Sequence, residues 1–152
     1  MQKGDLVPNF TLLDQQGEEQ NLYSFLEKGP VVLFFYPAAM TSGCTKESCH
    51  FRDLAGEFAA SGAQRIGISM DSVDKQAQFT AKNSLDYPLL ADVKGDVAKI
   101  FGVKRPFDFL KVKRTTFVIS QDRRVIDVIT SEMNMNVHAE RALVALAGNT
   151  GQ

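Results

Sequence analysis

The stretch VVLFFYPAAMTSGC, residues 31–44, decides the fold class of this chain. Its first six residues are continuously apolar, and Gly29, Pro30 and Pro37 bound them, as is typical of a strand buried on both faces. Beyond it, apolar side chains recur at helical spacing, at Phe51, Leu54, Ala55, Phe58 and Ala59. We therefore predict a central strand over 31–36, a turn over 37–45, and a helix that Ser61 and Gly62 end.

The rest of the chain alternates between strands and helices. Short strands at 10–13 and 20–22 flank a turn at 14–17, and a second core strand covers 65–70. Helices are predicted at 73–83, 96–101 and 137–147, and an antiparallel hairpin at 115–120 and 125–130. This order predicts an α/β fold, a thioredoxin-like three-layer sandwich with a mixed central sheet and an N-terminal β-hairpin. We expect one domain over 1–152, with 148–152 a flexible tail.

The composition is that of an ordinary folded domain. The chain has 152 residues, 44% of them hydrophobic and 23% charged, which disfavours disorder and disulfide-rich scaffolds. Seventeen Lys and Arg against 18 Asp and Glu give a net charge of -1, so the overall charge does not favour binding to nucleic acid or to anionic lipid. The longest apolar run, 31–40, is about half a membrane span, and no secretory pattern begins the chain. We expect a cytoplasmic protein without a membrane or nucleic-acid partner.

The two cysteines are the chemical signal of the sequence. Cys44 lies at the predicted strand-to-helix turn, at the carboxyl end of a central strand, where α/β folds place reactive sites. Thr41 or Ser42 at the N-cap would put Cys44 in the first helical turn, beside unpaired N–H groups and the positive end of the macrodipole. A thiolate is favoured there, so Cys44 is the predicted nucleophile, provided that its pocket is at least partly open.

Cys49 lies five residues further along the same predicted helix. At 100° per residue it falls on roughly the opposite side from Cys44, and ideal geometry puts their Cα atoms about 8.6 Å apart. A disulfide requires about 7 Å or less, so bonding would require the helix to unwind locally. The spacing therefore suggests that Cys44 reacts first and that the turn then melts to present Cys49.

The pattern Pro37-x-x-x-Thr41-x-x-Cys44 resembles the peroxiredoxin active-site signature, and Cys49 resembles the peroxiredoxin Q subgroup, also called bacterioferritin comigratory protein. Further matching stretches are GDLVPNF at 4–10, GISMDS at 67–72, YPLLAD at 87–92 and KRTTFVI at 113–119. The resemblance implies antioxidant reduction of hydrogen peroxide or organic hydroperoxides at Cys44 through a sulfenic acid. Condensation with Cys49 would give a disulfide that thioredoxin, or a similar dithiol, reduces. No metal or organic cofactor is implied.

The resemblance and the chemistry together assign the remaining site residues. Arg114 matches the family's active-site arginine, and its planar charged fork suits the negative charge that develops on sulfur and oxygen. The Thr41 hydroxyl and the N–H groups of Gly43 and Cys44 would add donors, and Pro37 would shield the thiol from water. Ser42 departs from the family, which commonly has proline there, so we expect altered rigidity of this loop. No cysteine follows Cys49, which disfavours an intermolecular resolving step. We expect a monomer, with a weak dimer as the alternative.

Other interpretations remain open from the residues alone. One is a general thiol-disulfide oxidoreductase, which peroxide consumption would distinguish. Another is a zinc or redox-sensing module built on Cys44, Cys49, His50 and His138, although zinc ligands usually lie closer together in sequence. A basic cluster with interleaved Phe107 and Phe109 suggests nucleic acid only weakly, and a solvated loop is preferred; its cations are Lys104, Arg105, Lys111, Lys113 and Arg114. We interpret Met133 and Met135 as loop residues, and Asp71 and Ser72 as a turn and cap.

Overall fold

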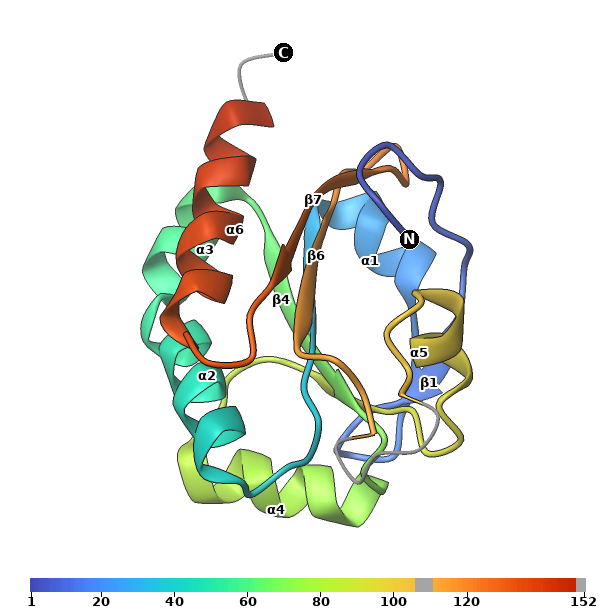
Figure 1. The fold of residues 1–152 in the computed structure, drawn as a ribbon, viewed down its shortest axis with the longest axis vertical. Helices are drawn as coiled ribbons and strands as arrows, with labels where there is room; N and C mark the ends of the chain where they lie inside the picture. Colours follow the sequence, from blue (N-terminus) through green and yellow to red (C-terminus); the bar gives the residue numbers. More distant parts are fainter. Residues whose placement is uncertain (106–110, 150–152) are drawn as a thin grey trace.

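The computed structural model describes residues 1–105 and 111–149, which form one mixed sheet between two layers of helices (Figure 1). The seven strands run in the order β2-β1-β5-β4-β3-β6-β7. Their bounds are β1 Thr11–Leu13, β2 Glu19–Asn21, β3 Val31–Phe35, β4 Gln64–Ser69, β5 Leu89–Ala91, β6 Thr115–Ile119 and β7 Val125–Thr130. The helices are α1 Leu22–Lys28, α2 Ser42–Asp53, α3 Ala55–Ser61, α4 Val73–Asn83, α5 Asp96–Ile100 and α6 Asn136–Asn149.

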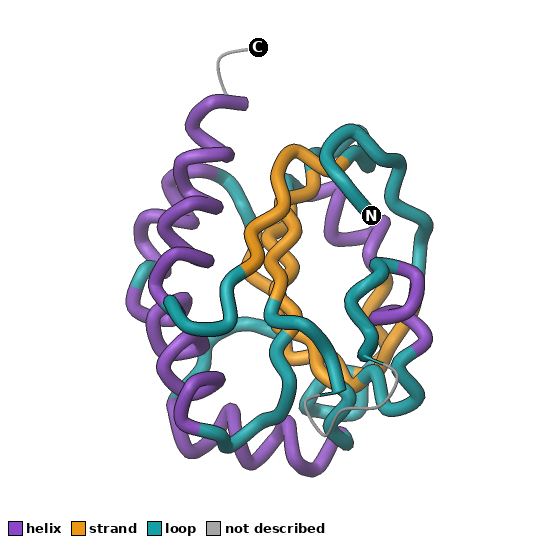
Figure 2. The backbone as a smooth tube through the Cα atoms, viewed as in Figure 1, coloured by secondary structure: helices purple, strands orange, loops and turns teal. Residues whose placement is uncertain are grey.

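The sheet is parallel in its middle and antiparallel at both ends. Strand β4 pairs in parallel with β3 and β5, whereas the β1–β2 and β6–β7 pairs are antiparallel hairpins. Figure 2 shows the strands in orange between two groups of purple helices. The predicted α/β class, mixed central sheet and N-terminal hairpin are confirmed.

The central strand β3 builds both cores because its side chains alternate between the two faces. Val31, Leu33 and Phe35 pack in a cluster with residues of α1 and α5. Val32, Phe34 and Tyr36 pack in a second cluster with residues of α2, α3, α4 and α6. All these side chains are at most 1% exposed, as the continuous apolar run predicted.

The helix predicted after Pro37 is divided. At Leu54 the backbone leaves helical values, with φ −95° and ψ 22°, so α2 ends and α3 begins. The apolar face nevertheless continues, because the rings of Phe51 and Phe58 stack 5.7 Å apart. Gly62 then ends α3 in the left-handed conformation, as predicted.

Two elements were missed and one was longer than predicted. The strand expected over 20–22 ends at Asn21, whose side chain accepts from the Ser24 N–H (3.2 Å) and begins α1. Strand β5 has only three residues, too few to show a period. Helix α6 includes Gly148 and Asn149, the first two residues of the expected tail over 148–152. The remainder, 150–152, lies outside the described residues.

The described helices include none that is long and apolar enough to cross a membrane.

Candidate active site

Cys44 lies where the chain leaves the centre of the sheet. The pairing of β3 with β4 continues one residue beyond β3, because the Tyr36 N–H donates to the carbonyl oxygen of Ile68 in β4 (3.1 Å). The chain then turns, and α2 begins at Ser42, which places Cys44 in its first turn. Cys44 is fully buried and packs with the second core cluster. This is the position that the sequence predicted for the reactive thiol.

A carboxylate just beyond the end of β4 holds the loop between β3 and α2. The Oδ2 atom of Asp71 accepts from the Ala39 N–H (2.7 Å) and from the Ser69 hydroxyl (2.6 Å). The neighbouring Ser72 caps α4 by accepting from the Lys75 N–H (3.2 Å), as expected. Asp71 therefore positions the active-site loop, a role beyond the predicted turn.

Thr41 occupies the N-cap position of α2, but its side chain makes no capping hydrogen bond. Its hydroxyl instead donates to the Ala38 carbonyl (2.8 Å), within the preceding turn. The helical hydrogen bonds start with the Thr45 N–H, which donates to the Thr41 carbonyl (2.9 Å). The N–H groups of Gly43 and Cys44 precede this bond, so they belong to the unpaired first turn. Thr41 is thus the N-cap residue, as predicted, although its side chain does not cap the helix, and the predicted helix end lies beside the thiol.

Arg114 reaches the thiol from the neighbouring strand. In the antiparallel pairing of β3 with β6, Phe35 lies opposite Thr115, so Arg114 enters the sheet at the edge where β3 ends. Its Nη2 donates to the Cys44 Sγ (3.2 Å), and its Nη1 donates to the Glu47 Oε1 (2.7 Å). The guanidinium therefore bridges a thiol and a carboxylate, and Arg114 is only 5% exposed.

The carboxylate that completes this bridge is fully buried. Burial raises the pKa of Glu47 to about 7, although the Arg114 charge opposes the shift. Burial would lower the pKa of Arg114, but Glu47 and Cys44 outweigh it and raise that pKa. Glu132 holds the Arg114 backbone, since its Oε1 accepts from the Arg114 N–H (3.1 Å) and from the Arg105 guanidinium (2.9 Å).

Gly43 and Pro37 shape the approach to the thiol. A Cβ added at Gly43 would lie 3.3 Å from the Arg114 Nη2 and 3.4 Å from the Met135 Cε, so the helix backbone lies close to both side chains. Pro37 is buried at the start of the loop. Met135, interpreted from sequence as a loop residue, therefore lies beside Arg114 and Gly43.

Cys49 lies in a different environment on the same helix. It is half-buried, and its thiol donates to the Asn83 Oδ1 (3.7 Å) at the end of α4. The Arg52 guanidinium also donates to the Asn83 carbonyl. Both cysteines are free thiols within an intact α2, so joining them requires the helix to open.

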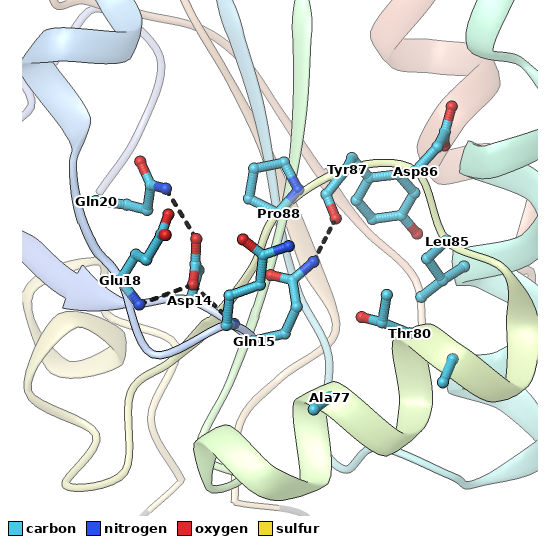
Figure 3. Close-up of a pocket in the computed structure, with 12 residues that line it drawn as sticks. Asp14, Gln15, Glu18, Gln20, Ala77, Thr80, Leu85, Asp86, Tyr87 and Pro88 are labelled. Atoms are coloured by element: carbon cyan, nitrogen blue, oxygen red, sulfur yellow. Dashed lines mark hydrogen bonds between the residues drawn. The ribbon is translucent and has the colours of Figure 1, made fainter.

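A large open cavity lies elsewhere, between the β1–β2 turn and the end of α4 (Figure 3). It measures about 540 Å³, and its lining includes neither cysteine. The Gln15 amide bridges it, donating to the Tyr87 carbonyl (3.2 Å) and accepting from the Leu89 N–H (2.9 Å). Asp14 is likewise satisfied, by the N–H groups of its own turn and by the Gln20 amide (2.8 Å). These bonds stabilise the turn and leave the thiol site as the chemical centre.

The structure bears on two of the alternative interpretations, the zinc site and the basic cluster. Within 1–105 and 111–149, no group of three or more His, Cys, Asp and Glu side chains is arranged to hold a metal ion. Arg105 and Arg114, from the basic cluster, pair with the carboxylates of Glu132 and Glu47. Phe107 and Phe109 lie outside the described residues.

Glu47 is the site residue that sequence reasoning missed. Its signal was the spacing Cys44-x-x-Glu47, which puts the carboxylate one helical turn beyond the thiol on the same face. A glutamate on a helix is ordinarily exposed to solvent, and its burial here is explained by its ion pair with Arg114, the residue that precedes β6.

A thioredoxin-like fold with a buried thiol in the first turn of a helix, bonded to an arginine from the sheet, defines a thiol-dependent redox protein. Residues 3–128 match the family model described as the AhpC/TSA family. A putative peroxiredoxin of Mycobacterium tuberculosis is 58% identical over 148 residues, 96% of each chain. The chain belongs to the AhpC/TSA family and is a peroxiredoxin, as the sequence motifs indicated.

Two solved structures share the fold. Peroxidoxin BcpB from Mycobacterium tuberculosis superposes with a TM-score of 0.94 at 57% identity, covering 98% of each chain. A bacterioferritin comigratory protein of Xanthomonas campestris, studied for alkyl peroxide reduction, gives a TM-score of 0.84 at 28% identity, covering 91% of this chain and 90% of its own.

Proposed function

We propose that this protein is a peroxidase that reduces hydrogen peroxide and organic hydroperoxides at Cys44, with Cys49 as the resolving thiol. The observation that carries the proposal is the contact of the Arg114 Nη2 with the Cys44 Sγ (3.2 Å) at the start of α2. A fixed cation and unpaired N–H groups around one sulfur favour its thiolate, which is the nucleophile. The membership of the family supports the same chemistry.

In the first step the Cys44 thiolate attacks one peroxide oxygen and the O–O bond breaks. The sulfur becomes a sulfenic acid, and the leaving oxygen departs as hydroxide or alkoxide and takes a proton to form water or alcohol. Negative charge spreads over sulfur and both oxygens in the transition state. Arg114 stabilises that charge together with the Gly43 and Cys44 N–H groups. Thr41 is the N-cap residue of the same helix, and Pro37, buried at the start of the loop, keeps water from the thiol.

In the second step α2 opens and the Cys49 thiolate attacks the sulfenic sulfur, forming the S–S bond and breaking the S–O bond; the hydroxide that leaves takes a proton to form water. A dithiol protein of the thioredoxin kind then exchanges with this disulfide and restores both thiols. The free thiols fit a reducing compartment such as the cytoplasm, and the intramolecular route fits a monomer. Antioxidant defence is the cellular role that follows.

One equivalent of hydrogen peroxide added to the reduced protein tests the proposal. We expect rapid loss of both thiols and an internal disulfide in the wild type, no reaction in Cys44→Ser, and a trapped sulfenic acid in Cys49→Ser. Intact mass and thiol titration distinguish these products. A wild type that keeps its thiols for minutes would contradict the peroxidase proposal.

A further inference from the structure

A buried histidine from α6 faces the active-site carboxylate and has no role in the steps above. His138 and Glu47 are both 0% exposed, and the His138 Nδ1 lies 3.6 Å from the Glu47 Oε2. The other oxygen, Oε1, holds Arg114, and Arg114 holds Cys44. A continuous chain of contacts therefore runs from His138 through Glu47 and Arg114 to the reactive sulfur.

The hydrogen bonds around the imidazole indicate which nitrogen carries its proton. The Nε2 lies 2.9 Å from the Ser131 carbonyl oxygen, which only accepts, so Nε2 is protonated. In the neutral ring Nδ1 is then an acceptor, and the Thr116 hydroxyl lies 2.8 Å from it. Among the described residues, Glu47 Oε2 is buried without a hydrogen-bond partner. The Thr116 hydroxyl can donate to a neutral Nδ1 or accept from a protonated one, whereas Oε2 has no donor, so one proton on Oε2 or on Nδ1 would relieve the buried charge of the carboxylate.

We propose that Glu47 and His138 share one proton, and that this pair sets how much positive charge Arg114 presents to Cys44. With the proton the pair is neutral overall, and the guanidinium charge acts on the thiolate in full. Without it the pair is an anion in contact with Arg114, which opposes ionisation of the sulfur. His138 is thus a positioning residue acting through Glu47, a proposal that rests on Cys44 being the nucleophile.

The groups around the pair are consistent with one proton held near neutral pH. Burial raises the pKa of Glu47 to about 7 against the pull of Arg114, and Glu132 on the β7–α6 connection raises it further. Burial lowers the pKa of His138, and so do the charges of Arg114 and of Arg141 on α6, whereas the Ser131 carbonyl and Glu132 oppose that shift.

Among the described residues, Tyr87, which precedes β5, interacts with Glu47, and Cys44 on α2 interacts with Arg114. Burial raises the pKa of Tyr87 above its usual range, so its hydroxyl stays neutral wherever the pair titrates.

The test compares four proteins in the Cys49→Ser background, where Cys44 is the only thiol. They carry either no further change, His138→Gln, Glu47→Gln, or both replacements. The measurement is the rate of Cys44 oxidation by hydrogen peroxide from about pH 5 to about pH 9, alongside thiolate absorbance. Glutamine at 138 donates to the Glu47 carboxylate without titrating, so we expect the rate near neutral pH to fall about fivefold.

The double variant separates positioning from packing. If His138 acts through Glu47, His138→Gln has no further effect on rate or thiolate absorbance once Glu47 is glutamine. The matched control is His50→Gln. His50 also faces a glutamate between α2 and α6, with its Nε2 3.6 Å from the Glu140 Oε1, but this pair does not contact Arg114. We expect its pH profile to match that of the parent.

Nitrogen-15 spectra of the two imidazoles supply a readout independent of activity. We expect the His138 ring to titrate together with the inflection in the oxidation rate and to lose that transition in Glu47→Gln. An unchanging Nε2–H ring across the range, with equal pH profiles for the parent and His138→Gln, would overturn the proposal. If the parent itself does not react with peroxide, the proposed function fails instead.

Discussion

The two cysteines lie on one helix, and their environments differ in every respect that controls thiol chemistry. Cys44 is fully buried in the first turn of α2 and accepts from the Arg114 guanidinium (3.2 Å). Cys49 is half-buried one turn later and donates to the Asn83 side chain (3.7 Å). One sulfur therefore accepts a hydrogen bond from a fixed cation at the start of a helix, and the other is a donor itself. The position along the helix and one charged partner therefore distinguish Cys44, the proposed nucleophile, from Cys49, the proposed resolving thiol.

The sharpest test of this difference is the replacement of Arg114 with Lys. A single ammonium cannot contact both the Cys44 Sγ and the Glu47 Oε1 as the guanidinium fork does. We expect the rate of Cys44 oxidation by peroxide to fall about 100-fold, measured by stopped-flow mixing. Arg105→Lys, which alters an arginine paired with Glu132, is the matched control and should change the rate little. A rate within about twofold of wild type for Arg114→Lys would end the assignment.

The second test concerns the carboxylate that stabilises the Cys44 side. Because the folded pKa of Glu47, about 7, lies above its ordinary 4.5, the unfolded chain ionises first as pH rises. The free energy of unfolding should therefore fall between these values, by about 3 kcal/mol. The pKa of His138 is lowered in the folded protein, so the unfolded chain is protonated first as pH falls below 6.5, the ordinary pKa of histidine. This lowers the free energy of unfolding on the acidic side. Urea titrations at each pH give the free energy of unfolding of the wild type and of Glu47→Gln. The decrease caused by Glu47 should be absent in the variant. The same pH dependence in both proteins would contradict the prediction.

The third test perturbs the approach to Cys44 without touching a charge. An alanine Cβ at Gly43 would lie 3.3 Å from the Arg114 Nη2 and 3.4 Å from the Met135 Cε, so both side chains must shift slightly. We expect Gly43→Ala to slow peroxide reduction about tenfold, with little change in folding. Gly56→Ala, where nothing lies within 4 Å of the added atom, is the control that should leave the rate unchanged. Equal rates for the two variants would show that Gly43 does not set the position of Arg114.

The smallest effect is expected on the Cys49 side. Asn83→Ala removes the acceptor that holds the Cys49 thiol against α4, which should ease the opening of α2. We expect the disulfide to form about twofold faster after oxidation, measured by rapid quench and intact mass. Lys82→Ala, one residue earlier on the exposed side of α4, controls for helix propensity. Slower disulfide formation in Asn83→Ala would mean that this contact guides Cys49 instead of restraining it.

The sequence predicted the parts of the molecule that local patterns encode. The run over 31–36 marked the central strand, the spacing from Phe51 to Phe58 marked the buried helix face, and Ser72 marked a helix start. Helix α1 and strand β5 were missed because seven and three residues carry too little periodicity. The break at Leu54 was missed because the apolar spacing continues through it.

For the site, the sequence by itself determined that Cys44 begins a helix, that Cys49 faces away from it, and that a family motif surrounds both. Only the tertiary structure decided that Glu47 is buried, that His138 stands behind it, and that Asp71 holds the active-site loop. The physical reason is the separation along the sequence of the residues that interact. Helix position follows from residues three or four apart, whereas the Arg114 to Glu47 and Glu47 to His138 contacts join residues 67 and 91 positions apart along the chain. Only packing brings such groups together, and their burial then changes their protonation.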